Sequence, residues 1–126
     1  MHSTLADINT LDLDLACLKQ MQDLMGDQFK PLVEKYLLTA EEKIEKAHRA
    51  NMHNDFKQLY KIAHTLKSNS ASLGAKNVAS IAEQIEDLSQ TVHAGDDYQT
   101  QKRLDALIEE LRNAYMRIKP VLINIA

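Results

Sequence analysis

The sequence has 126 residues, the usual length of one domain with room for a hydrophobic core. Its content of 44% hydrophobic and 26% charged residues favours a globular chain over a disordered one. A formal net charge of −3 argues against nucleic acid as a partner, because binding to a phosphate backbone needs a basic surface. No apolar run approaches the roughly 18 to 20 residues of a membrane-spanning helix, so we expect no membrane association.

With three glycines, two prolines and many good helix formers, the composition indicates an all-α fold. Residues 1–10 are polar and expected to be frayed. Apolar residues at helical spacing then predict a first, short helix, which Gly26 closes with a left-handed cap. These apolar residues are Leu11, Leu15, Leu18 and Met21 or Met25.

A second, long helix is predicted to end near Ala50. Asp27 is its expected N-cap, and Pro31 falls in its first turn, where the missing N–H of proline costs nothing. Its apolar stripe consists of Phe29, Leu32, Val33, Tyr36, Leu37, Ala40, Ile44 and Ala47. A polar break follows at residues 51–54, and Asn54 is the expected cap of a third helix that begins at Asp55.

Three further helices complete the pattern. The third ends at Gly74 and buries Phe56, Leu59, Ile62, Ala63, Leu66, Ser70 and Leu73. The fourth starts near Lys76 and buries Val78, Ile81, Ile85, Leu88 and Val92. Residues 93–97 are predicted to be a helix-to-helix junction, because a glycine is followed there by an aspartate that can cap the next helix. The fifth buries Leu104, Leu107, Ile108, Leu111, Ala114 or Tyr115, and Ile118, until Pro120 kinks or ends it.

Four long helices with short connections predict an antiparallel up-and-down four-helix bundle, with the additional short N-terminal helix packed across one end. We expect residues 1–126 to form a single domain. The apolar C-terminal tail, residues 120–126, has three open interpretations. It packs back on the bundle, marks the truncation of a larger protein, or forms a self-association patch.

His64 is the residue that stands out on the third helix. At about 100° per residue it lies roughly 140° from the centre of the apolar arc, on the exposed side. Lys61 and Lys67, three residues before and after it, are within side-chain reach of the imidazole. Flanking cations suit a group that receives a negatively charged phosphoryl group, although a solvated helix face rich in lysine is an equally open interpretation.

The segment Ala63-His64-Thr65-Leu66-Lys67, followed by small residues and then Leu73-Gly74-Ala75, resembles the signature of histidine-containing phosphotransfer (HPt) domains. The resemblance implies that His64 is the phosphorylated histidine, Lys67 the lysine beside it, and Gly74 the structural glycine that ends the same helix. The family usually has glycine directly after that lysine, whereas this chain has Ser68.

The resemblance also implies partners and a cofactor. A receiver domain of a hybrid histidine kinase would bring the aspartyl phosphate and the Mg²⁺, and the receiver of a response regulator would take the phosphoryl group. Tyr60, Lys61, Ser68 and Ala71 are the expected docking surface for such receivers. The chain itself is expected to bind no cofactor and to be a monomer.

A nucleophilic imidazole must be neutral, and an exposed histidine with an ordinary pKa of about 6.5 is mostly neutral at pH 7. Its tautomer is normally fixed by a hydrogen bond at the other ring nitrogen. Glu86, which follows Ile85 on the fourth helix, is our candidate for this orienting role, because HPt sequences often carry an acidic or amide residue there. A surface glutamate without a role stays an open alternative.

Other functions find little support. His48 and His53 lack a cysteine or carboxylate at ligand spacing, so we expect no metal site. The chain has no glycine-rich loop to hold ATP phosphates and is not expected to be an ATP-dependent kinase by itself. The single cysteine, Cys17, and the absence of a signal-peptide pattern predict a cytoplasmic protein.

Two alternatives to a phosphorelay intermediate stay open. The first is a non-catalytic helical binding module that docks or sequesters a receiver, which Ser68 in place of glycine weakly favours. The second is a helical assembly domain that dimerises through residues 118–126, with His64 dispensable.

Overall fold

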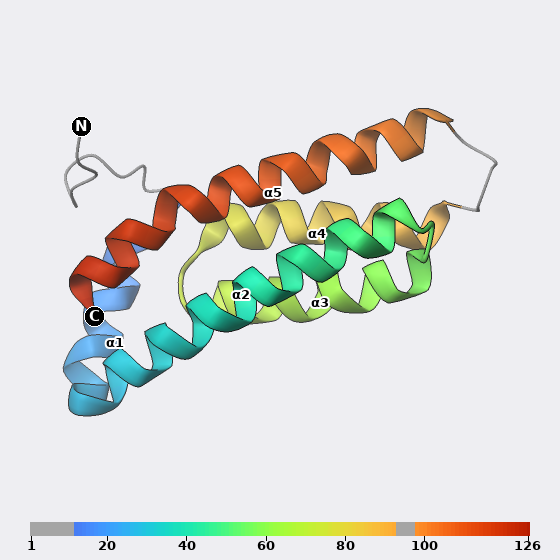
Figure 1. The fold of residues 1–126 in the computed structure, drawn as a ribbon. Coiled ribbons are helices and arrows are strands. Elements are labelled where there is room, and N and C mark those ends of the chain that lie inside the picture. Colours follow the sequence, from blue (N-terminus) through green and yellow to red (C-terminus); the bar gives the residue numbers. More distant parts are fainter. Residues whose placement is uncertain (1–11, 93–97) are drawn as a thin grey trace.

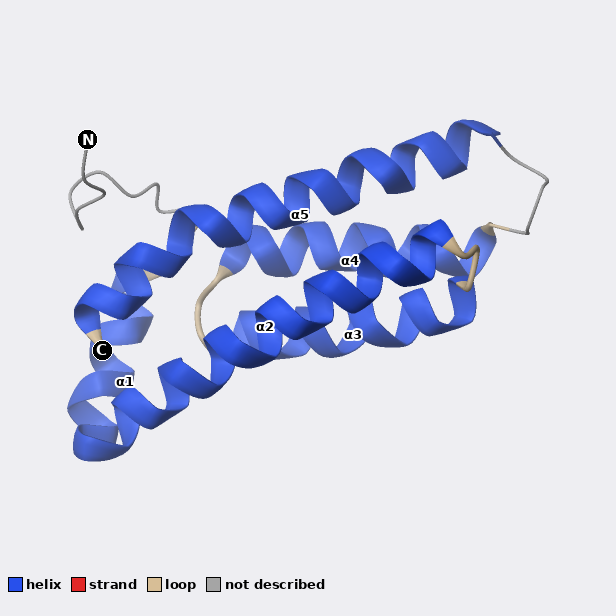
Figure 2. Cartoon of the chain, viewed as in Figure 1, coloured by secondary structure: helices blue, strands red, loops and turns tan. Residues whose placement is uncertain are grey.

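The computed structural model describes residues 12–92 and 98–126. In this part of the chain every regular element is a helix, as Figure 2 shows. The elements are α1 (Leu15–Met25), the 3₁₀ helix η1 (Gly26–Gln28), α2 (Phe29–Met52), α3 (Phe56–Ser72), α4 (Lys76–Thr91) and α5 (Tyr98–Ile125). The all-α prediction is therefore confirmed. The predictions for residues 1–10, Leu11 and the junction 93–97 lie outside the described residues.

The four long helices run side by side in alternating directions, and α1 lies at one end of the bundle, beside the start of α2 (Figure 1). Each long helix contacts two others, so that α2, α3, α4 and α5 close a ring around one core. This is the predicted antiparallel up-and-down four-helix bundle with an additional short helix. The short connections between α2, α3 and α4 leave antiparallel packing as the only compact arrangement of these neighbours.

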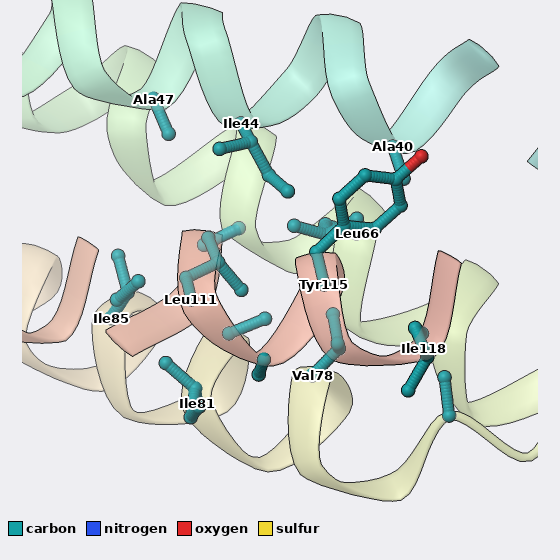
Figure 3. Close-up of a cluster of buried hydrophobic side chains, with 14 of the residues drawn as sticks. Ala40, Ile44, Ala47, Leu66, Val78, Ile81, Ile85, Leu111, Tyr115 and Ile118 are labelled. Carbon is teal, nitrogen blue, oxygen red and sulfur yellow. The ribbon is translucent and has the colours of Figure 1, made fainter. Parts of the chain in front are cut away.

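The core forms where the apolar stripes of the four long helices meet. Figure 3 shows Ile44 of α2, Leu66 of α3, Ile85 of α4 and Leu111 of α5 among the buried side chains that point into the space between the helices. Fully burying a side chain of this kind contributes about 1.5–3 kcal/mol. Both residues that the sequence left as alternatives on α5 are buried, and Tyr115 also donates a hydrogen bond of 3.0 Å to the carbonyl of Leu37.

The segment before α1 is tied to the bundle by polar contacts. Asp12 is buried and accepts hydrogen bonds from Asn77 of α4 at 3.0 Å and from Arg117 of α5 at 3.1 and 3.2 Å. Asp14 is the N-cap of α1, where its Oδ1 accepts from the backbone N–H of Cys17 at 3.0 Å. This segment therefore bridges α4 and α5.

Gly74 lies in the connection between α3 and α4 and contacts the segment before α1. Its φ of +78° is in the left-handed region, and its carbonyl accepts a hydrogen bond of 2.8 Å from the backbone N–H of Asp14. A Cβ added at Gly74 would lie 3.2 Å from Asp14 Cβ and 3.3 Å from Asp14 O. Both the backbone conformation and the close approach of Asp14 require a glycine.

Two predicted helix caps are wrong. Asp27 lies inside η1 and makes no cap, because η1 runs directly into α2 and its Gly26 carbonyl accepts from the Phe29 N–H. The N-cap of α3 is Asp55 rather than Asn54, because Asp55 Oδ1 accepts from the Gln58 N–H at 3.2 Å. Asn54 instead makes the turn with a φ of +55°.

The polar break after the second helix is shorter than predicted. α2 continues to Met52, and Asn51 is buried. Its amide donates to Asp105 at 2.6 Å and its Oδ1 accepts from Gln101 at 3.3 Å, both from α5. Partners on a distant helix therefore make a buried asparagine acceptable at this position.

Pro120 was predicted to kink or end the fifth helix, and it does not end it, because α5 continues to Ile125. A proline inside a helix costs about 3 kcal/mol. Burial of Val121 and Leu122 offsets this cost, since each contributes about 1.5–3 kcal/mol when fully buried. The apolar tail thus packs back on the bundle, where Gln22 of α1 donates a hydrogen bond of 3.0 Å to the carbonyl of Ile125.

Candidate functional site

His64 lies on the outer face of α3, and its side chain is 55% exposed. The ring of Tyr60, one helical turn earlier, lies roughly parallel to the imidazole, with 6.3 Å between ring centroids and 16° between ring planes. Tyr60 therefore limits the ring orientations open to His64 without covering it. The exposed position agrees with the sequence prediction.

Glu86 of α4 contacts both His64 and Lys67. Its Oε2 lies 3.0 Å from Nδ1 of His64, and its Oε1 lies 2.8 Å from Nζ of Lys67. The contact with Lys67 is an ion pair between a carboxylate and an ammonium group. Only 10% of the Glu86 side chain is exposed, against 30% for Lys67. The open alternative of a surface glutamate is therefore wrong.

These contacts fix the charge state of Glu86. Its pKa is held below the ordinary value chiefly by the hydrogen-bonding and charge interaction with Lys67. Burial works in the opposite direction, and His64 adds a smaller lowering effect. The pKa of Lys67 is raised, mainly by Glu86 and further by Glu83 and Asp87. Near neutral pH the Glu86 carboxylate is thus ionised and Lys67 is protonated.

An ionised carboxylate only accepts hydrogen bonds, so the ring nitrogen that faces it must carry the proton. Nδ1 of His64 is that nitrogen. A neutral imidazole has a single N–H, and the lone pair is therefore on Nε2. The arrangement leaves an exposed ring with a free nucleophilic nitrogen next to an ammonium group.

The helical hairpin of α3 and α4 positions these groups. Ile85 is fully buried, and the next residue along α4 falls at the edge of the apolar stripe, facing α3. The short connection at 73–75 makes the two helices antiparallel, which brings Glu86 level with His64, 22 residues earlier. The site is thus built on two rigid helices and not on loops.

The remaining predicted residues surround His64 on α3. Lys61, Ser68 and Ala71 are exposed, and Tyr60 is half-buried. Ser68, Ala71 and Lys67 line a shallow depression between α3 and α4. Ser70 is fully buried, as predicted, and its Oγ lies 2.8 Å from the hydroxyl oxygen of Tyr36.

The chain was also compared with known proteins. A family model described as Hpt domain matches residues 31–114, which include all of α3 and α4 and most of α2 and α5. The chain belongs to the Hpt domain family. Its role is therefore histidine phosphotransfer in a phosphorelay.

The fold of this Hpt domain is similar to the crystal structure of histidine-containing phosphotransfer protein B from Pseudomonas aeruginosa. The TM-score is 0.79 with 24% sequence identity, and the match covers 90% of this chain and 92% of the other. At this identity the likeness shows the bundle fold. None of the curated protein sequences matches this chain significantly.

Sequence reasoning missed two features of the Hpt domain's site. The stacking of Tyr60 on His64 was not predicted, although the spacing of four residues on a helix places side chains together. The effect of Glu83 and Asp87 on Lys67 was missed as well, because it depends on how α4 is rotated against α3.

Among residues 12–92 and 98–126, the structure brings together no group of three or more His, Cys, Asp or Glu side chains that could hold a metal ion. Within the same ranges, no helix has the length and apolar character needed to cross a bilayer.

Proposed function

We propose that His64 accepts a phosphoryl group on Nε2 from the aspartyl phosphate of a hybrid kinase's receiver domain. It then passes this group to the receiver of a response regulator. The observation that supports this proposal is the exposed imidazole whose Nδ1 is hydrogen-bonded to an ionised carboxylate. A fixed tautomer and a rigid helix supply the positioning that phosphoryl transfer mainly requires.

In this proposal Glu86 orients the ring. Its hydrogen bond to Nδ1 selects the tautomer with the lone pair on Nε2 and holds the ring plane. Because Glu86 is almost buried on α4, its carboxylate has little freedom to follow a moving ring. The ring is therefore held ready for in-line attack on phosphorus.

Lys67 orients and partly neutralises the incoming phosphoryl group. Its ammonium lies on the same helix face, one turn after His64, and is partly exposed. A partly exposed lysine supplies a charge that solvent screens, so it guides the phosphoryl group without binding it tightly. This suits a group that must leave again for the next receiver.

The proposed docking surface consists of Tyr60, Lys61, Ser68 and Ala71. The last two carry little side-chain bulk, so a receiver's backbone meets few obstacles beside His64. Mg²⁺, which neutralises charge on the phosphoryl oxygens, is expected to come with the receiver. A relay must exchange partners, and we therefore propose a small, transient interface, a monomeric chain and a cytoplasmic location.

The test is transfer of label. The purified chain is mixed with Mg²⁺ and a labelled phospho-receiver from a hybrid kinase of its own organism, and acid-labile label on the chain is followed. The two variants are His64→Gln and a matched control, His48→Gln. The control changes a different exposed histidine, which lies on α2. Label is expected on the wild type and on His48→Gln, and none on His64→Gln. Equal labelling of all three chains would contradict the assignment of His64.

The orienting role is tested separately with Glu86→Ala. We expect slower phosphorylation of His64 because the tautomer is no longer selected, while helical circular dichroism and cooperative urea unfolding are retained. A rate equal to the wild type's would remove Glu86 from the mechanism.

A second candidate function is a binding module that docks or sequesters a receiver without transferring phosphoryl groups. The observation in its favour is Ser68, which stands where the family usually has glycine and lies exposed in the shallow depression beside Lys67. If several phospho-receivers bind the chain and none transfers label, the binding module becomes the better proposal. Assembly through residues 118–126 has little support, since Ile118, Val121 and Leu122 are buried in the bundle.

A further inference from the structure

The orienting role described above does not require a charge. A glutamine in place of Glu86 could also accept a hydrogen bond from Nδ1 of His64 through its amide oxygen. A nearly buried carboxylate, by contrast, pays a desolvation cost that Lys67 must offset. The charge of Glu86 therefore needs a physical reason beyond ring orientation.

We propose that the negative charge of Glu86 keeps the proton on Nδ1 after Nε2 of His64 has been phosphorylated, and thereby makes phospho-His64 a better phosphoryl donor. This inference rests on the proposed function in one respect, that His64 is the phosphorylated residue.

The chemistry of both half-reactions supports a proton that stays in place. When Nε2 attacks the aspartyl phosphate, the new P–N bond forms as the P–O bond breaks, and the bond electrons leave with the aspartate carboxylate. The ring then carries Nδ1–H and a formal positive charge, which Glu86 faces at 3.0 Å. When the P–N bond breaks, its electron pair returns to Nε2, and the leaving group is neutral imidazole with Nδ1–H still bound.

Without a proton on Nδ1, the same bond would have to release an imidazolide anion, which is a far poorer leaving group. The amide oxygen of a glutamine would accept from Nδ1–H but would supply no charge opposite the positive ring. A carboxylate in this position stabilises the protonated phosphoimidazole selectively. Glu86 thus favours onward transfer.

The charged groups around the ring come from α3 and α4. On α3 these are Lys61 and Lys67, with the uncharged phenol of Tyr60 against the ring. On α4, Glu86 contacts Nδ1 directly. Glu83 and Asp87, also on α4, act on Lys67. Among these groups Glu86 is the anion that contacts the ring, so its removal should dominate any change.

Lys67 adds a second step to the argument. Its ion pair with Glu86 compensates the carboxylate while His64 is unmodified. A phosphoryl group on Nε2 offers Lys67 a new anionic partner on the same helix face. Each contact that Lys67 makes with the phosphoryl oxygens leaves the charge of Glu86 less compensated and more effective at Nδ1.

The size of the effect follows from exposure. Opposite charges in contact typically shift a titration midpoint by 1–3 pH units, and a ring as exposed as that of His64 falls at the lower end. We therefore expect a displacement of about one pH unit between wild type and Glu86→Gln, which is about tenfold in rate on the alkaline side.

The test avoids receivers by loading His64 with phosphoramidate, a small phosphoryl donor. Wild type, Glu86→Gln and Glu83→Gln are loaded, freed of donor, and followed by ³¹P NMR as the phosphohistidine hydrolyses from about pH 5 to about pH 9, the range in which histidines titrate. Glu83→Gln is the matched control, because it removes one negative charge from the same face of α4 without touching His64.

The wild type and Glu83→Gln should share one pH profile, and Glu86→Gln should have its midpoint about one unit lower, with hydrolysis about tenfold slower on the alkaline side. A Glu86→Gln profile that coincides with the wild type's would overturn the inference. An equal displacement of the midpoint in Glu83→Gln would also overturn it, because the shift would then follow from the loss of any negative charge on α4 and not from the contact of Glu86 with Nδ1.

A second measurement does not depend on any variant folding. The ¹⁵N resonances of the phosphorylated wild-type ring report directly whether Nδ1 is protonated, and a deprotonated Nδ1 at pH 7 would overturn the inference. If phosphoramidate does not label His64 at all, the inference and the proposed function both fail. If phosphoramidate gives the expected profiles while no receiver transfers label, only the relay fails.

Discussion

The hydrogen bond between Tyr36 and Ser70 ties α2 to α3, the helix that carries His64, and it can be tested by a double-mutant cycle. Both residues are buried, and their hydroxyl oxygens are 2.8 Å apart. Tyr36→Phe leaves the Ser70 hydroxyl without this partner, and Ser70→Ala does the same to the Tyr36 hydroxyl. Each orphaned buried hydroxyl costs about 1–3 kcal/mol.

The double variant leaves neither hydroxyl orphaned, so it should lose less stability than the sum of the two single variants. We expect a coupling free energy of about 1–2 kcal/mol in urea unfolding, since contacting residues couple by about 0.5–3 kcal/mol. Burial raises the pKa of Tyr36 to about 12, with the Ser70 bond acting against the rise. Because burial holds this folded-state pKa above the ordinary value, the stability that comes from the buried neutral phenol of Tyr36 is intact below about pH 10 and is lost as pH rises towards 12.

Ser89→Ala is the matched control. Ser89 is a second buried serine, on α4, and its hydroxyl donates to the carbonyl of Ile85 within its own helix. Combined with Tyr36→Phe it should be additive within about 0.5 kcal/mol. Additivity of Tyr36→Phe and Ser70→Ala themselves would refute the reasoning, and it would mean that Ser70 turns to a carbonyl of its own helix when Tyr36 no longer bonds to it.

Two further predictions concern the segment before α1. Gly74→Ala should lower the free energy of unfolding, measured in urea, by about 2–3 kcal/mol. An alanine in the left-handed conformation costs about 1–2 kcal/mol, and crowding of the hydrogen bond from Asp14 costs about 1 kcal/mol more. An unchanged unfolding midpoint would contradict this. Burial pushes the pKa of Asp12 upward, but the hydrogen bonds from Arg117 and Asn77, with the charge of Arg117, outweigh it and hold that pKa below its ordinary value. The carboxylate's contribution to stability is therefore present above about pH 4 and is lost as pH falls further, so the stability gap between wild type and Asp12→Asn should close on acidification; a gap that stays constant down to about pH 2 would exclude the network.

Helical periodicity was sufficient to predict the bundle. Every residue assigned to the buried side of α3 is buried, because an antiparallel bundle covers one continuous stripe of that helix. The same rule missed Leu13, which is fully buried in a segment that is not helical and therefore shows no period. Periodicity predicts which residues of a helix are buried, and it predicts nothing for segments without regular secondary structure.

The site was predictable only in part. The exposed position of His64 follows from the helical periodicity of α3 alone. The burial of Glu86 depends on how α4 is rotated against α3, and this rotation cannot be derived from a single sequence. The same holds for Asn51, whose partners Asp105 and Gln101 lie on α5. Residues whose environment is local were predicted from periodicity. Of the residues whose partners come from another helix, Glu86 was named with the help of the family resemblance, and Asn51 was not predicted.

The contact between His64 and Glu86 spans only 22 positions of the chain, and most of these are helical. Closing a short and largely stiffened loop costs little entropy, so the reacting groups are among the earliest that folding can bring together. No side chain of α2 or α5 belongs to the triad of His64, Lys67 and Glu86. Those two helices are therefore free to diverge in sequence, within the limits of packing, while the spacing on which phosphoryl transfer depends is kept.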